Sequence, residues 1–202
     1  MPDNMTPGSW EKAYAEGTAH WAESREPSLF AKDFVKELEW RKAKTILEIG
    51  CGNGRDSIYF AKKGFKVIAI DMAPSAVELA KANADKAGVG VDIKQANAEN
   101  LTFGINSFDA VFSLSVLHST NLPASISEVH RVLKYKGYAF IHIYGNTIFP
   151  GGKININISL DNYLSLLKEV GFSILDFYAE EENKADASGE KHTVYVAKLV
   201  GV

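Results

Sequence analysis

The chain has 202 residues, of which 46% are apolar and 23% are charged, and 22 basic residues against 25 acidic ones leave a formal net charge of −3. This length predicts one domain whose core is large enough to fold without disulfides or a structural metal. The slightly acidic balance lacks the basic excess of proteins that bind duplex nucleic acid or an anionic membrane, so neither partner is expected.

The leading part of the chain predicts two helices, around residues 10–14 and 28–40. From residue 45 on, short apolar runs alternate with longer amphipathic stretches. Runs of this kind suit strands covered on both faces, and they occupy residues 45–49, 66–70, 108–114 and 138–144. In residues 91–94, apolar and polar side chains alternate, which is typical of an edge strand with one face exposed to solvent. Helices are predicted at 56–63, 74–86, 124–134 and 160–170.

The alternation of strand and helix predicts a parallel sheet with helices on both sides. The last two strand-like runs, 172–178 and 193–199, are joined by a polar segment without a helix, so they should pair antiparallel. The expected fold is therefore an α/β, Rossmann-like three-layer sandwich. Its seven-stranded sheet is mostly parallel and has one antiparallel strand near the C-terminus.

A glycine loop follows the first of these strands, with glycines at positions 50, 52 and 54 and a predicted helix behind them. Glycine allows a sharp turn and lets a ligand approach the main chain at the carboxyl edge of the sheet. A dinucleotide fingerprint, GxGxxG, needs its third glycine where this chain has Arg55, which weakens a nicotinamide interpretation. The spacing also excludes a P-loop.

Asp71 ends the second predicted strand, about twenty residues after the loop, where a carboxylate accepts hydrogen bonds from ribose hydroxyls. The alternative is that Asp71 only caps the next helix. The strand, loop, helix, strand and acid together predict an adenosine site.

These residues resemble a known family. The segment 48–54, Glu-Ile-Gly-Cys-Gly-Asn-Gly, is similar to motif I of the class I S-adenosylmethionine-dependent methyltransferases, and Asp71 matches the ribose-binding acid of that family. Residues 95–101 match its adenine-reading segment, 108–113 its fourth strand and 128–137 the helix before its fifth. The spacing of Trp10, Tyr14 and Gly17 is most similar to the tellurite-resistance and thiopurine methyltransferase branch.

The resemblance implies S-adenosylmethionine as the cofactor. It also implies a helical lid at residues 1–40 and an S-adenosylmethionine-binding methyltransferase domain at 41–202. The cofactor-binding residues that it implies are Glu48, Gly50, Cys51, Gly52, Asn53, Gly54, Arg55, Asp71, Met72, Asn97, Ala98, Ser113, Trp10 and Tyr14.

Several of these positions have expected roles. Gly50 and Gly52 should face the methionine part of the cofactor, and Ser113 should border it. Met72 should pack on the adenine, whose edge Asn97 and Ala98 should meet. Asn97 stands where the family usually has an aspartate, so this contact loses its charge.

Structural roles compete with these assignments. Glu48 could equally hold the glycine loop in place instead of contacting the cofactor. Met72 could equally fill core space, and Arg55 could equally be a solvated charge at the end of a helix. The single cysteine, Cys51, excludes a disulfide framework, fits a reducing and cytoplasmic compartment, and is better explained as a small buried thiol than as a nucleophile. The sequence shows neither a run of about 18 apolar residues nor a signal-peptide core.

Trp10, Tyr14 and Trp21 are candidates for an aromatic lid over the cofactor, with plain helix packing as the alternative. His118, after the fourth strand, is the candidate catalytic base, with a hydrogen-bonded loop histidine as the alternative. His130 and His142 are assigned to packing. No histidine spacing indicates a metal site.

A sulfonium carries an activated methyl group, so the expected reaction is an in-line displacement in a dry pocket. The expected acceptor is a small molecule, with a thiol or chalcogen nucleophile favoured because it needs little help in losing a proton. Two alternatives stay open: a cofactor-binding module without turnover, and a nicotinamide-dependent oxidoreductase. The sequence does not determine the oligomeric state.

Overall fold

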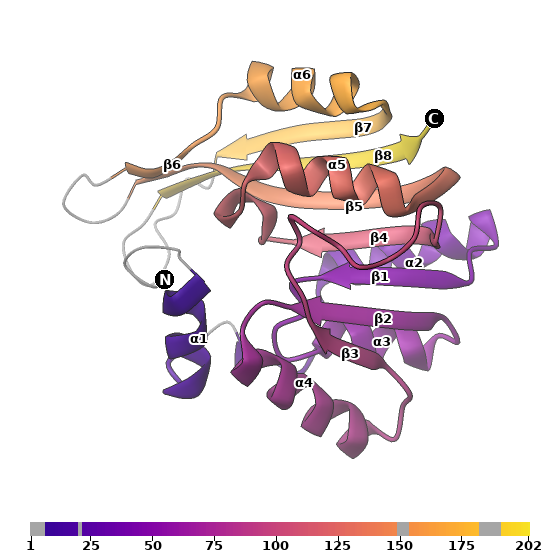
Figure 1. Cartoon of the computed structure of the whole chain (residues 1–202), viewed down its shortest axis with the longest axis vertical. Coiled ribbons are helices and arrows are strands. Elements are labelled where there is room, and N and C mark those ends of the chain that lie inside the picture. Colours follow the sequence, from indigo (N-terminus) through magenta and orange to yellow (C-terminus); the bar gives the residue numbers. More distant parts are fainter. Residues whose placement is uncertain (1–6, 20–21, 149–153, 182–190) are drawn as a thin grey trace.

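The structure is a computed structural model that describes residues 7–19, 22–148, 154–181 and 191–202. Within these residues, the main sheet has the strand order β3-β2-β1-β4-β5-β8-β7 (Figure 1). Its strands are β1 (Thr45–Ile49), β2 (Lys66–Asp71), β3 (Asp92–Gln95), β4 (Phe108–Leu114), β5 (Leu133–Ile148), β7 (Phe172–Glu181) and β8 (Lys191–Gly201).

Strand direction in the main sheet agrees with the sequence-based expectation. Neighbouring strands from β3 to β5 pair parallel, whereas β8 pairs antiparallel with both β5 and β7. The mostly parallel sheet with one reversed strand near the C-terminus is therefore confirmed. β3 lies at the edge, as its alternating pattern indicated.

One further strand was not predicted. β6 (Ile154–Asn157) pairs antiparallel with the end of β5, where Asn146 faces Asn157. β5 runs for 16 residues and extends beyond the parallel part of the sheet. Its end would leave an unpaired edge, and β6 covers that edge.

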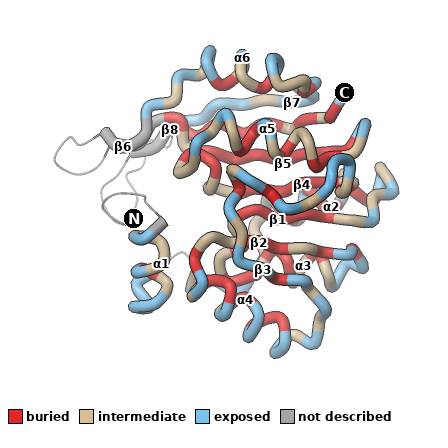
Figure 2. The backbone as a smooth tube through the Cα atoms, viewed as in Figure 1, coloured by how far each residue is buried: buried red, intermediate tan, exposed pale blue. Residues whose placement is uncertain are grey.

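The helices form two layers on the sheet, as expected. α2 (Leu29–Arg41), α3 (Arg55–Lys62) and α4 (Pro74–Ala87) cover one face, because their buried side chains pack with Val67 or Ala69 of β2. α5 (Leu122–Val132) and α6 (Leu160–Val170) cover the other face, where they pack with Ile70 and Val111. Figure 2 shows the buried sheet between these layers and exposed residues on the helices.

The boundary between α5 and β5 differs from the prediction. The helix ends at Val132 and the strand begins at Leu133, five residues before the expected start at residue 138. Leu133 is buried and pairs with Phe108, and a register shift follows before Ala110 meets Tyr138. The pairing of Leu133 with Phe108 extends β5 toward its N-terminal end. The boundary between α5 and β5 is therefore set by this tertiary contact and not by local helix propensity.

α1 (Pro7–Ala15) lies beside the carboxyl ends of the parallel strands (Figure 1). α2, by contrast, is an integral part of the sandwich, since Ala31, Phe34, Val35 and Leu38 are buried in the core. The part of the leading segment that lies outside the core layers is thus shorter than the predicted 1–40. No helix among the described residues has the length and apolar character to cross a membrane.

Candidate active site

A cavity of about 1020 Å³ opens at the carboxyl edge of the sheet. It runs from Ala98, after β3, past Asp71 at the end of β2 and Gly50 after β1, to Leu114 of β4 and His142 of β5. Small-molecule pockets span about 300–1,000 Å³, so this space is large enough for a nucleoside-sized ligand together with a second small molecule. The strand order sets the sequence of groups along the cavity wall.

The glycine loop forms the floor beside β1. Gly50 and Gly52 have φ of 76° and 54°, a backbone conformation that favours glycine. A Cβ on Gly50 would lie 2.1 Å from Val116 Cγ2, and one on Gly52 would lie 2.7 Å from the hydroxyl oxygen of Tyr14. The N–H groups of Gly50 and Cys51 both donate to the Ile70 carbonyl, at 2.7 and 2.9 Å, which fixes the loop to β2.

Gly54 has a structural role that differs from that of Gly50 and Gly52. It is the N-cap of α3, with φ of 79°, and its Cβ would lie 3.1 Å from the Cβ of Ala80 on α4. It is not among the residues that line the cavity. Its role is therefore to let α3 and α4 approach each other, and the structure does not bring it to the predicted site.

Asp71 holds the loop from the neighbouring strand. Its carboxylate accepts hydrogen bonds from the N–H groups of Gly52 (2.9 Å) and Ala73 (3.0 Å), and the residue lines the cavity beside Met72. Burial raises the pKa of this carboxyl, and the backbone N–H groups only partly counter that effect. Asp71 thus holds the glycine loop through hydrogen bonds and also presents an acidic side chain to the cavity.

Two further acids lie beneath the loop. Glu48 and Asp56 are buried and line the cavity, and Glu48 accepts a short hydrogen bond from the Ser57 hydroxyl. Burial raises the pKa of Glu48 well above its ordinary value, and the neighbouring Asp56 adds to the shift. Burial also raises the pKa of the Cys51 thiol, so Cys51 stays protonated and is a poor nucleophile.

Arg55 and Asn53 connect this floor to its surroundings. The Arg55 guanidinium lies 3.9 Å from the Asp56 carboxylate, with both residues on the cavity wall. The side-chain amide of Asn53 donates to the carbonyls of Ala22 and Ser24, at 2.7 and 2.8 Å. Asn53 therefore ties the segment between α1 and α2 to the glycine loop, a role that the sequence did not indicate.

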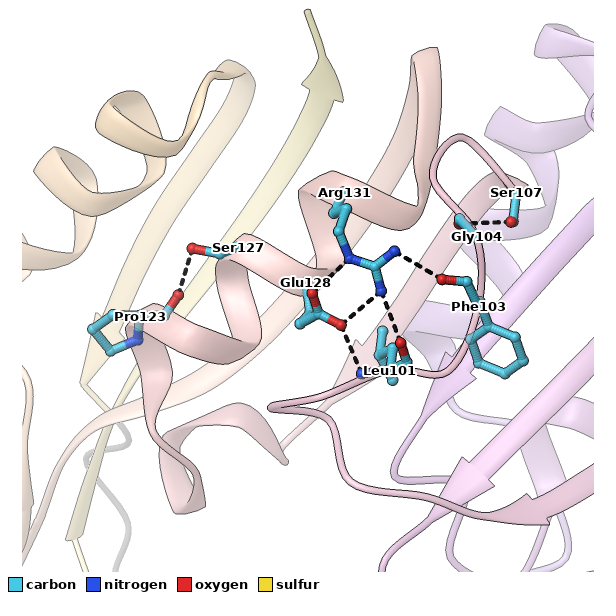
Figure 3. Close-up of polar contacts among 8 residues, drawn as sticks. All are labelled: Leu101, Phe103, Gly104, Ser107, Pro123, Ser127, Glu128 and Arg131. Carbon is cyan, nitrogen blue, oxygen red and sulfur yellow. Dashed lines mark hydrogen bonds and ion pairs between the residues drawn. The ribbon is translucent and has the colours of Figure 1, made fainter.

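The loop after β3 is held in place by an ion pair on α5 (Figure 3). Arg131 binds both carboxylate oxygens of Glu128, at 2.6 and 2.7 Å, and also donates to the carbonyls of Leu101 and Phe103. Glu128 in turn accepts the Leu101 N–H at 2.6 Å. This arrangement positions Ala98, which lines the cavity.

Asn97 is not brought to the cavity. It is exposed, and its side-chain oxygen accepts the N–H of Glu99 at 2.9 Å. The local turn occupies one lone pair of the Asn97 oxygen, and the residue lies outside the cavity lining, so the structure does not bring it to an adenine edge. Ala98 and Glu99 line the wall in its place.

The N-terminal helix closes one side of the cavity. Trp10 and Tyr14 line it, and Glu11 between them accepts hydrogen bonds from the N–H (3.0 Å) and hydroxyl (2.6 Å) of Ser75 in the first turn of α4. Trp21, the third predicted lid aromatic, lies outside the described residues.

The β4–β5 end of the cavity differs most from the expectation. Ser113 is fully buried, is not among the lining residues, and its hydroxyl has no hydrogen-bond partner within the described parts of the chain. His118, in the 3₁₀ helix η2 (Leu117–Ser119), accepts the Tyr144 N–H on Nδ1 at 3.3 Å and is also absent from the lining. The structure thus places His118 as a hydrogen-bonded histidine behind the cavity wall.

The residues that form this end were not singled out as site residues. They are Phe30 of α2, Leu114 and Ser115 of β4 and its exit, and His142 and Tyr144 of β5. His142 had been assigned to packing, but it lines the cavity, and its Nδ1 lies 3.0 Å from the Ser115 hydroxyl. The sequence could have indicated His142 as a site residue, because it lies toward the carboxyl end of the fifth parallel strand, and that edge of such sheets forms the ligand site.

Comparison with known proteins agrees with this geometry. Residues 47–141 match a family model described as a methyltransferase domain. A Geobacillus protein named as a methyltransferase is 28% identical over 178 residues, which cover 81% of this chain and 72% of the relative. The crystal structure of an S-adenosylmethionine-dependent methyltransferase from Methanosarcina mazei is 25% identical, with a TM-score of 0.65 over 78% of this chain and 92% of that one.

The comparisons support an S-adenosylmethionine-dependent methyltransferase for this chain. A ubiquinone biosynthesis O-methyltransferase of Azorhizobium caulinodans is 32% identical to this chain over 115 residues, which are 56% of this chain and 46% of that protein. The chain thus matches about half the length of that relative. The similarity concerns the methyltransferase domain and does not identify a methyl acceptor.

The cavity lining fits S-adenosylmethionine. Bare main chain at Gly50 and Gly52 leaves a cradle that any Cβ would fill, and a carboxylate stands at the end of β2. The described lining carries the carboxyls of Asp33, Glu48, Asp56, Asp71 and Glu99 but only one guanidinium, that of Arg55. Such a wall suits a cationic sulfonium and ammonium and disfavours the pyrophosphate of a dinucleotide.

Proposed function

We propose that this chain transfers the methyl group of S-adenosylmethionine to a small molecule bound at the β4–β5 end of its cavity. The observation that carries the proposal is the continuity of that cavity. It joins a nucleoside-sized space over β1–β3 to an end lined by Phe30, Leu114 and His142. Cofactor and acceptor can therefore lie end to end without a barrier between them.

The proposed cofactor pose follows the order of the strands. The adenine lies by Ala98 and Met72, the ribose hydroxyls bind Asp71, and the methionine part crosses the main chain of Gly50 and Gly52. Gly54, Asn97 and Ser113 lie outside the lining and have structural roles in this pose. The sulfonium then points toward Leu114, because β4 is the next strand after β1.

The proposed lid is α1 together with the segment bound to Asn53. Trp10 and Tyr14 lie over the cavity and exclude water from one side of the bound cofactor. The Glu11–Ser75 hydrogen bonds hold α1 in this position. The proposed lid comprises residues 7–19 and 22–28, which is shorter than the expected 1–40 because α2 packs into the core.

The proposed reaction is an in-line displacement. A lone pair of the acceptor forms a bond to the methyl carbon, the bond from that carbon to the sulfonium sulfur breaks, and its electron pair stays on the sulfur of S-adenosylhomocysteine. The acceptor loses its proton in the same step or after it. The chain contributes mainly alignment and the exclusion of water.

The chemistry of the acceptor end favours a neutral thiol over a chalcogen oxyanion such as selenite or tellurite. Phe30, Leu29 and Leu114 provide apolar surface there. Among the described lining residues, Arg55 is the one cation, and it lies beside Asp56. An oxyanion would therefore be desolvated without a dedicated cationic partner, which costs free energy.

A turnover assay tests the proposal. The protein is incubated with S-adenosylmethionine and, separately, an alkyl thiol, an aryl thiol, a quinol, a small amine, selenite or tellurite, and S-adenosylhomocysteine release is measured. We expect release with thiols and little with the oxyanions. Tight binding of S-adenosylmethionine in calorimetry without release for any acceptor would instead support a cofactor-binding module without turnover.

A further inference from the structure

Ser115 and His142 contact each other through both backbone and side chain at the β4–β5 end of the cavity, where the methyl acceptor is proposed to bind. The Ser115 N–H donates to the His142 carbonyl at 2.9 Å, and the Ser115 hydroxyl lies 3.0 Å from the His142 Nδ1. His142 belongs to β5, and Ser115 directly follows β4, whose last residue Leu114 is the register partner of His142. The backbone contact thus places the serine hydroxyl against the ring nitrogen.

The backbone of Ser115 supports a specific role for this residue. Its φ is 59°, in the left-handed region that residues other than glycine, asparagine and aspartate seldom adopt. At a position that favours glycine, the chain has a serine whose hydroxyl faces the imidazole. A residue held in such a conformation at a cavity wall is a functional candidate.

The orientation of His142 is determined by its ring contacts. The ring packs on Phe30, with centroids 5.3 Å apart, and edge-on to Tyr144, with centroids 5.8 Å apart. Ser115 occupies Nδ1, so Nε2 lies on the opposite side of a ring that lines the cavity. Among the described residues, Nε2 has no hydrogen-bond partner.

The surroundings keep His142 neutral. Burial lowers its pKa to about 4, and the hydrogen bond at its own backbone counters this only partly. Other titratable and charged groups of the cavity lining are Asp33 of α2, Tyr144 of β5, and Arg55 and Asp56 at the start of α3, and the His118 ring of η2 packs on Tyr144. None of them is among the causes of the shift, so burial decides the protonation state.

We propose that His142 accepts, on Nε2, the proton of a thiol or hydroxyl acceptor during methyl transfer, and that Ser115 is the positioning residue that keeps Nδ1 protonated. This inference rests on the proposed function and adds the requirement that the acceptor is a protic nucleophile. His118, the histidine that the sequence indicated, does not line this end of the cavity.

The proton and electron balance of the step is complete. The acceptor S–H or O–H bond gives its proton to Nε2, and its electron pair forms the bond to the methyl carbon. The bond from sulfonium to methyl breaks toward sulfur, which becomes the neutral thioether of S-adenosylhomocysteine. His142 becomes an imidazolium only when the positive charge of the cofactor disappears, and it then returns the proton to solvent. A neutral imidazole suffices because the acceptor becomes strongly acidic as its new bond forms.

The test compares two thiol acceptors in three variants of the full chain. One acceptor is an alkyl thiol that is protonated at pH 7, and the other is an aryl thiol that is already ionised. For His142→Gln we expect a fall in kcat of about 100-fold or more with the alkyl thiol. The fall should be several-fold at most with the aryl thiol, and calorimetric affinity for S-adenosylmethionine should stay within about two-fold. Ser115→Gly, which suits the φ of 59°, should lower kcat for the alkyl thiol by about ten-fold.

His130→Gln is the matched control. His130 lies on α5, packs edge-on against Phe172 and does not line the cavity, so this variant should keep the wild-type kcat with both thiols. Nitrogen NMR of the histidine rings adds a readout independent of turnover. We expect His142 in the neutral Nδ1–H form in the wild type and a mixture of tautomers in Ser115→Gly.

The outcomes separate the two proposals. A wild-type protein that binds S-adenosylmethionine but methylates neither thiol nor any hydroxyl acceptor overturns the proposed function, and this inference with it. If the wild type is active and His142→Gln loses nothing, or loses equally with both thiols, only the role of His142 is overturned. A proton found on Nε2 in the wild type has the same consequence.

Discussion

The carboxylate of Asp71 accepts a hydrogen bond from the N–H of Gly52 at 2.9 Å. The acid at the end of β2 and the glycine loop after β1 therefore hold each other before any ligand binds. A second N–H, from Ala73, leaves the carboxylate fixed in orientation toward the cavity. Such preorganisation reduces the free energy that ligand binding must spend on ordering the site.

Removal of the Asp71 carboxylate should weaken cofactor binding. We expect Asp71→Ala to lower the affinity for S-adenosylmethionine by at least ten-fold, about 1.4 kcal/mol, because both the loop anchor and the ribose contact are lost. Isothermal calorimetry measures this effect. Asp92→Asn on β3 is the control, since Asp92 is exposed, pairs with Lys94 and does not line the cavity. Equal affinities for wild type and Asp71→Ala would remove Asp71 from the ribose site.

Cofactor affinity should depend on pH through the cavity acids. Burial raises the pKa values of Glu48 and Asp71 in the ligand-free protein. A sulfonium binds the ionised carboxylates better, so binding should release protons, and affinity should rise with pH above the ordinary carboxyl range of about 4. S-adenosylhomocysteine lacks the sulfonium charge and should respond less. Calorimetry of both ligands between pH 5 and 8 tests this, and a constant ratio of their affinities would contradict it.

The hydrogen bonds between Glu11 and Ser75 should control the lid. Glu11→Ala removes the acceptor of both bonds, so α1 should separate from α4 more often. We expect the dissociation rate of S-adenosylmethionine to rise by about five- to ten-fold, since a hydrogen bond to a charged group contributes about 1.5 kcal/mol or more. Stopped-flow displacement measures the rate. Glu16→Ala, which removes an exposed acid that directly follows α1 and lies 3.9 Å from Lys12, should leave the rate unchanged. Similar rates in both variants would exclude α1 as the lid.

Asp109 should stabilise the amino edge of the sheet. Burial opposes its ionisation, but hydrogen bonds from Lys134, Lys44 and Thr45 outweigh burial and lower the pKa of Asp109 to about 2. Because the folded pKa lies below the ordinary value, the stabilisation is present above about pH 4 and is lost as the pH falls toward 2.

Substitution of Asp109 tests this assignment. Asp109→Asn should lower the free energy of unfolding at pH 7 by about 1 kcal/mol, a figure reduced for partial exposure, and by less at pH 3. Urea unfolding at both pH values measures it. Asp176→Asn, which removes the exposed pair with Lys198, should cost under about 0.5 kcal/mol. A loss for Asp109→Asn that is the same at pH 3 and pH 7 would argue against the assignment.

Much of the fold and part of the candidate site could be predicted from local patterns. Continuous apolar runs, capping residues and glycine spacing are properties of neighbouring residues, and they were sufficient for the alternating layers, the reversed strand and the loop at Gly50. The same reasoning identified Asp71, because the end of a parallel strand is where ligands bind.

Other features depend on contacts between segments far apart in the chain. Local residue patterns were enough to predict the sheet, the glycine loop and the acid at the end of β2, since each follows from the residue types within a few positions. Only the tertiary structure showed that Asn97 uses its oxygen in a local turn, that His118 lies behind the wall, and that His142 meets Ser115 in the cavity. The physical reason is that a side chain's partner depends on which strands become neighbours and in what register, and neither is a local property of the chain.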